Sequence, residues 1–61
     1  MTNTDRAMCK ANMDRAARAL AQYEAALADA ATNADEVAFL RKAIASNRNY
    51  IQAGRDALLA A

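Results

Sequence analysis

The feature that most constrains this chain is a heptad seam between residues 37 and 58. Its members recur at alternating spacings of three and four, and they include one polar side chain and one glycine: Val37, Leu40, Ile44, Asn47, Ile51, Gly54 and Leu58. Such spacing places all of them on one stripe of an α-helix that packs lengthwise against another helix. The sequence therefore predicts a long helix with a helical partner.

A second heptad seam occupies the first half of the chain. Its members are Cys9, Met13, Ala16, Leu20, Tyr23, Leu27 and Ala30. Upstream of the seam, either Thr2 or Thr4 can cap a helix, and Asp5 places a carboxylate near the positive end of the helix dipole. We expect a first helix from about residue 5 to residue 31.

Thr32 and Asn33 mark a turn between the two seams. They form the only consecutive pair of weak helix formers there, and Asn33 with Glu36 three residues later is typical of a helix start. The heptad phase also breaks at this point, because continuing the first seam would place Arg41 on it. We expect a second helix from about residue 34 to residue 60. The alternative is one continuous helix in a long coiled coil.

Folding the chain at this turn gives every large seam residue an apolar partner. Antiparallel pairing matches residues whose numbers sum to about 64. The layers are Leu27 with Val37, Leu20 with Ile44, Met13 with Ile51, Tyr23 near Leu40, and two thin layers, Ala16 with Asn47 and Cys9 with Gly54. The predicted fold of residues 1–61 is an all-α, antiparallel two-helix hairpin in a single domain.

The hairpin has too little apolar material to be self-sufficient. Of the 61 residues, 56% are hydrophobic, but 19 of these are alanines, which bury little area. A second stripe on the second helix is then left without a partner: Phe39, Ala43, Ser46, Tyr50, Ala53 and Ala57. Phe39, Tyr50 and Leu59 are expected to be exposed in a monomer. We therefore expect a homodimer in the form of a four-helix bundle. The same strip can also hold a docking surface for a foreign protein, since different parts of it can serve each purpose.

Arg41, Arg48 and Arg55 recur every seven residues and form a row beside the seam. The antiparallel pairing places Glu24 opposite Arg41, and it gives Arg48 and Arg55 no acidic partner. Three interpretations stay open for this row: a solvated face, a contact with an acidic protein surface, or a contact with nucleic-acid phosphates.

The composition argues against enzymatic chemistry. The chain has no histidine, a lone cysteine (Cys9), no glycine-rich loop and no ligand set typical of a metal site. A net charge of +1 is too small to indicate nucleic acid by itself. No apolar run approaches membrane-spanning length, and a lone cysteine suits a reducing compartment. We expect a cytoplasmic protein that is not an enzyme, needs no cofactor and does not contact a membrane.

In size, alanine-rich composition and hairpin pattern, the whole chain resembles the small helical-hairpin dimers that phages and plasmids encode. Among these it is most similar to the phage-made quorum-sensing anti-activators. The resemblance implies a homodimer that binds a host LuxR-type transcription activator and blocks its action on DNA. It also implies a pilus-assembly ATPase as a further partner, and a location in the host cytoplasm.

Two other classes share this architecture. The chain resembles the plasmid repressor-of-primer hairpins, which are dimers that bind paired RNA loops, and the helical-hairpin chaperones of type III secretion needle subunits. The function we expect is a small protein-binding inhibitor, with RNA binding and secretion chaperoning as alternatives. The expected binding residues, for the partner or the dimer, are Phe39, Ala43, Tyr50, Leu59, Arg41, Arg48 and Arg55.

Overall fold

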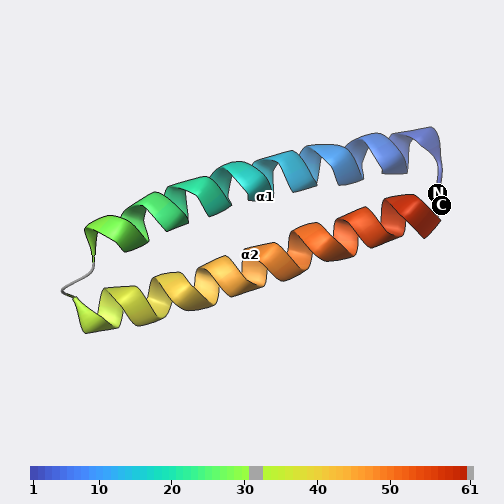
Figure 1. Ribbon diagram of the computed structural model, residues 1–61. Helices are drawn as coiled ribbons and strands as arrows, with labels where there is room; N and C mark the ends of the chain where they lie inside the picture. Colours follow the sequence, from blue (N-terminus) through green and yellow to red (C-terminus); the bar gives the residue numbers. More distant parts are fainter. Residues whose placement is uncertain (31–32, 61) are drawn as a thin grey trace.

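The computed structural model describes residues 1–30 and 33–60, and within them the chain forms two antiparallel α-helices (Figure 1). Helix α1 spans Asn3–Asp29 and helix α2 spans Ala34–Ala60. The start of α1 and the end of α2 lie together at one end of a rod that measures 46 × 15 × 12 Å. The predicted all-α hairpin is confirmed, and the alternative of one continuous helix is wrong.

A capping box opens α1. The Thr2 hydroxyl oxygen accepts a hydrogen bond from the Asp5 backbone N–H at 3.0 Å, and the Asp5 carboxylate accepts one from the Thr2 N–H at 3.4 Å. Both bonds satisfy backbone donors that a helix start leaves without partners. Thr2 rather than Thr4 is therefore the cap, and the helix begins two residues earlier than the expected residue 5.

Asn33 opens α2, as the sequence predicts. Its side-chain oxygen accepts from the Glu36 N–H at 3.1 Å, and its carbonyl accepts from the Val37 N–H at 2.9 Å. At the other end of the connection, the Ala30 carbonyl accepts from the Asn33 N–H at 2.9 Å. The expected end of the first helix at residue 31 and the Thr32 half of the turn lie outside the described residues.

The hydrophobic core is thin. Among the described residues only Ala30, Leu40, Ile44 and Ile51 are buried, and the other large seam residues are half-buried. Each helix has a single neighbour, so a side chain on the seam is covered from one direction only. The seam is confirmed as the contact between the helices, and it leaves much apolar surface in water. Neither described helix is apolar enough over a sufficient length to cross a membrane.

The helices pack closely at Gly54. A Cβ atom added there would lie 2.6 Å from Met13 Sδ and 2.7 Å from Met13 Cγ, which is too close for a real contact. The Cys9 thiol also donates a hydrogen bond to the Gly54 carbonyl at 3.7 Å. The predicted layer of Cys9 with Gly54 is therefore present, and Met13 joins it. The half-buried Cys9 serves as a packing residue in this layer.

Candidate partner-binding surfaces

The seam divides the surface of the hairpin into two faces, and each carries part of the predicted binding set. On the first, which we call the aromatic face, Phe39 is 66% exposed and Tyr50 is 51% exposed. Ala43 lies between them, half-buried. Tyr50 borders a shallow groove of about 280 Å³ between the helices, whose other lining residues are Asn12, Arg15, Ala16, Ala19 and Asn47.

Met8 extends the aromatic face onto α1, and the sequence analysis did not single it out. It lies one heptad before Arg15, which lines the groove beside Tyr50, so both point to the same side of α1. Met8 is 59% exposed. Its heptad position, which flanks the first seam, is the sequence signal that identifies it. The aromatic face therefore carries large apolar side chains from both helices.

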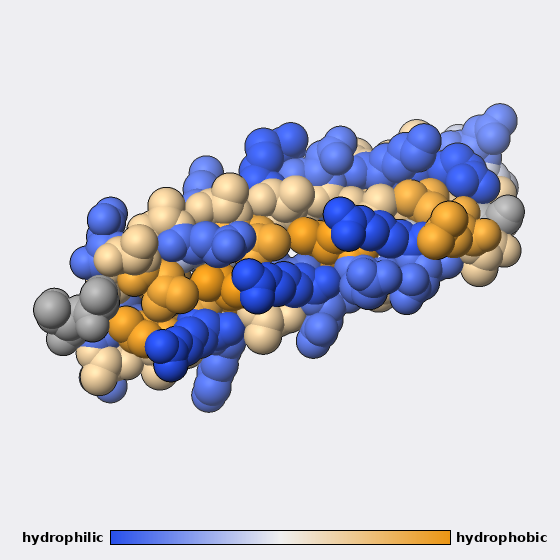
Figure 2. All heavy atoms as spheres, in the orientation of Figure 1, coloured by the Kyte–Doolittle hydropathy of each residue, from blue (hydrophilic) through white to orange (hydrophobic). Residues whose placement is uncertain are grey.

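The second face, which we call the arginine face, consists of Arg41, Arg48 and Arg55 of α2 with Glu24 of α1. Two grooves between the helices, of about 420 and 370 Å³, run along it and share Arg48 in their walls. Apolar seam side chains form their floor: Leu20, Leu27, Ile44 and Ile51. Figure 2 shows hydrophobic side chains reaching the surface along the line between the helices, with strongly hydrophilic side chains crossing that line.

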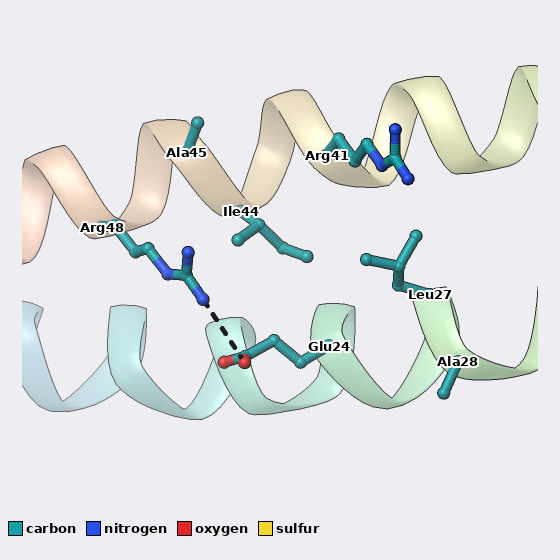
Figure 3. Close-up of a pocket in the computed structure, with 7 residues that line it drawn as sticks. All are labelled: Glu24, Leu27, Ala28, Arg41, Ile44, Ala45 and Arg48. Carbon is teal, nitrogen blue, oxygen red and sulfur yellow. Dashed lines mark ion pairs between the residues drawn. The ribbon is translucent and has the colours of Figure 1, made fainter.

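The ion pair on this face differs from the expected one. Glu24 pairs with Arg48, with 3.6 Å between the carboxylate and guanidinium, and not with Arg41 (Figure 3). Side chains lean toward the N-terminus of their own helix. Arg48 therefore leans toward the turn, while Glu24 leans away from it, and the two meet. Arg41 also leans toward the turn and so points away from Glu24.

Neither Arg41 nor Arg55 forms an ion pair with any residue that the structure describes. The expectation that Arg48 has no acidic partner is thus wrong. Both members of the Glu24–Arg48 pair are solvated, since their side chains are 50% and 62% exposed. The pair is therefore weak, and it neutralises only the middle arginine of the row.

No protein-family model, no curated protein and no solved structure matches this chain. These comparisons therefore identify no partner for either face. Within residues 1–30 and 33–60, no cluster of three or more histidine, cysteine or acidic side chains could hold a metal ion.

Leu59 is exposed, as expected, but it does not belong to the strip of Phe39 and Tyr50. It follows Tyr50 by nine residues, which is two and a half turns of helix, so it lies on the opposite side of α2. It follows Arg55 by four residues and therefore adjoins the arginine face at the open end of the hairpin. At 86% exposure it is the most exposed large hydrophobic residue among those described.

Proposed function

We propose that this chain is a homodimeric inhibitor that binds a host protein, with the aromatic face forming the dimer and the arginine face meeting the partner. The observation that carries this proposal is the placement of the two residue sets on opposite sides of one hairpin. Phe39 and Tyr50 lie on one side of the seam, while the arginine row lies on the other. A single chain can therefore use both faces at once.

The area that the hairpin exposes supports a dimer. A compact monomer of 6.5 kDa would expose about 3,800 Å². The hairpin exposes 4521 Å². The excess of roughly 700 Å² is close to the ~800 Å² that each partner buries in an interface of standard size. Pairing two aromatic faces would give a four-helix bundle in which Phe39, Tyr50 and Met8 are covered.

The identity of the partner rests on the resemblance to phage anti-activators. It makes a LuxR-type transcription activator the first candidate and a pilus-assembly ATPase the second, both in the host cytoplasm. The arginine face suits an acidic protein surface, because it carries three cations and one carboxylate. Because the surface that an activator uses for DNA is itself basic, the arginine face would meet an acidic surface elsewhere on the activator, and the block on DNA binding would be indirect.

The test is to titrate the purified chain into a complex of a LuxR-type activator with its promoter DNA and to follow DNA release by gel shift. We expect the activator to leave the DNA. Arg55→Glu should weaken this effect at least about tenfold, because a repulsive contact replaces an attractive one. Lys42→Glu is the matched control, since Lys42 is an exposed cation on the outer side of α2. An activator that stays on DNA at every concentration of the chain would contradict the proposal.

A nucleic-acid-binding hairpin of the repressor-of-primer kind is the second candidate. The observation in its favour is that Arg41 and Arg55 have no acidic partner among the described residues. Phosphate contacts release counterions, so RNA binding should weaken steeply as salt rises. Titration with a paired RNA loop at two salt concentrations separates the candidates: tight, strongly salt-dependent binding that Arg55→Glu abolishes would favour RNA over protein.

A further inference from the structure

We propose that the arginine face is a docking groove for one amphipathic α-helix of the partner protein, and that this helix carries acidic residues fourteen positions apart. The inference rests on the proposed function in one respect, namely that the arginine face, and not the aromatic face, meets the partner. It adds the secondary structure of the partner segment and the spacing of its charges.

The groove offers a third helix an apolar floor between α1 and α2. Its two halves lie end to end along the hairpin and meet at Arg48, whose side chain crosses the groove to Glu24, so a helix that spans both halves lies over this ion pair. The floor consists of Leu20, Leu27, Ile44 and Ile51, the long side chains of Glu24 and the three arginines rise beside it, and small side chains lie at the outer rims: Ala17, Ala28 and Ala45. Small residues at the rims leave room for a helix beside the arginines, and an apolar floor accepts side chains spaced three and four apart.

The charges fix the register of that helix. Seven residues of α-helix rise about 10.5 Å, so Arg41 and Arg55 stand about 21 Å apart along α2. A helix lying parallel or antiparallel to α2 repeats its own positions at the same interval. Arg48, between them, already has a weak, solvated ion pair with Glu24, whose carboxylate would repel an acidic side chain placed there. The partner helix therefore gains most from acidic residues opposite Arg41 and Arg55, and less from one opposite Arg48.

Leu59 supplies an apolar contact at the open end. It lies one turn beyond Arg55 on the same side of α2 and is almost fully exposed. A partner helix that spans the arginine row and continues by one turn would cover it. The occupant is thus an amphipathic helix of about 20 residues.

The experiment is a selection from a displayed library of 22-residue helical peptides. Their leucines are fixed at heptad seam positions, and three flanking positions, seven apart, vary among Glu, Gln and Lys. The peptides are selected against the whole chain. We expect Glu at the two outer positions, enriched at least tenfold over Lys, and weaker enrichment at the middle position. Selection against Arg55→Glu should reverse the preference to Lys at one outer position only.

Lys42→Glu is the control and should select the same peptides as the unaltered chain. The proposal is overturned if no helical peptide is enriched over scrambled sequences, or if Arg55→Glu selects the same residues as the unaltered chain. Peptides with the sequences of α1 and α2 are included, and their preferential enrichment would assign the groove to a second copy instead. Loss of the selected peptides with Tyr50→Ala, at a protein concentration where this variant keeps its helical content and dimer mass, would place them on the aromatic face and would also overturn it.

The experiment distinguishes two outcomes: the groove does not bind an acidic helix, or the chain does not have the proposed function. Dimer mass and release of the activator from DNA are measured on the same variants, without any peptide. If both behave as proposed while no acidic helix is selected, only the groove is wrong. If the chain neither dimerises nor releases the activator, the proposed function fails whatever the peptides do.

Discussion

Glu24 and Arg48 meet because each leans toward the N-terminus of its own helix, and in an antiparallel hairpin these two directions oppose each other. Matching residues by number alone assigned Glu24 to Arg41, because that arithmetic compares Cα positions and ignores the direction of long side chains. The seam layers are less affected, since their side chains are shorter and point straight at the facing helix. This is why the layer of Cys9 with Gly54 could be predicted and the ion pair could not.

Reversing the charge of Arg48 should destabilise the hairpin more than reversing Arg55. Arg48→Glu removes a solvated ion pair worth about 0.5 kcal/mol and places two carboxylates together. Arg55→Glu breaks no ion pair within the described residues and should change the free energy of unfolding by less than about 0.5 kcal/mol. Urea unfolding at low and high salt measures both. The difference between the variants should shrink as salt rises, and equal effects at low salt would contradict the assigned pair.

Gly54→Ala should destabilise the hairpin, although alanine is the better helix former. Its Cβ would displace Met13, at a cost of about 1–3 kcal/mol for overpacking, which outweighs a gain of about 1 kcal/mol in helix propensity. In a Met13→Ala background the clash is absent, so Gly54→Ala should become stabilising by about 1 kcal/mol. A double-mutant cycle by urea unfolding tests this. If Gly54→Ala changes the free energy of unfolding in the same direction with Met13 and with Ala at position 13, contact with Met13 is not the reason that glycine is required.

At the scale of the helices, the sequence predicts the second helix better than the start of the first. Asn33 with Glu36 is a sharp signal, and the hydrogen bond between them confirms it. Thr2 and Thr4 are both good caps, however, and no seam residue precedes Cys9 to decide between them. The decision comes from the reciprocal bond between Thr2 and Asp5, whose spacing of three residues fits a capping box. Thr4 lies too close to Asp5 to form one.

Asn33→Ala should lower the free energy of unfolding by about 1 kcal/mol, because the Glu36 N–H loses its hydrogen-bond acceptor. Asn49→Ala is the matched control. Asn49 is exposed in the middle of α2, so the change removes no cap and should stabilise the helix slightly through its better propensity. Thermal or urea unfolding of the two variants gives the comparison. An Asn33→Ala variant as stable as Asn49→Ala would show that the observed cap contributes nothing.

At the scale of the whole molecule, the sequence predicts correctly that Phe39, Tyr50 and Leu59 are exposed. It predicts only in part on which face of the hairpin each of them lies. Phe39 and Tyr50 share the second stripe and so lie on the same face. Leu59 also lies off the seam, but it follows Tyr50 by nine residues, which is two and a half turns of helix. It therefore lies on the opposite side of α2, beside the arginines. Met8 was missed because the flanking positions of the first helix were not followed to its start. Each face is made of residues from both helices, so its full set of residues follows only from how α1 packs against α2.

Tyr50→Ala should weaken the homodimer at least tenfold in dissociation constant, equivalent to about 1.4 kcal/mol, because Tyr50 is a large aromatic side chain at the middle of the proposed interface. Leu59→Ala is the matched control: it truncates a more exposed hydrophobic residue on the opposite side of α2. Sedimentation velocity across a dilution series measures both constants. If Leu59→Ala weakens the dimer and Tyr50→Ala does not, the dimer uses the arginine face.

We propose that the hairpin needs a second copy of itself to cover its apolar surface. Sedimentation equilibrium of the unaltered chain at micromolar concentration tests it most directly. We predict a mass of about 13 kDa, twice the 6.5 kDa of one chain, and unfolding that becomes easier on dilution because association and stability are linked. A cooperatively folded species of 6.5 kDa, with a midpoint independent of concentration, would contradict the account.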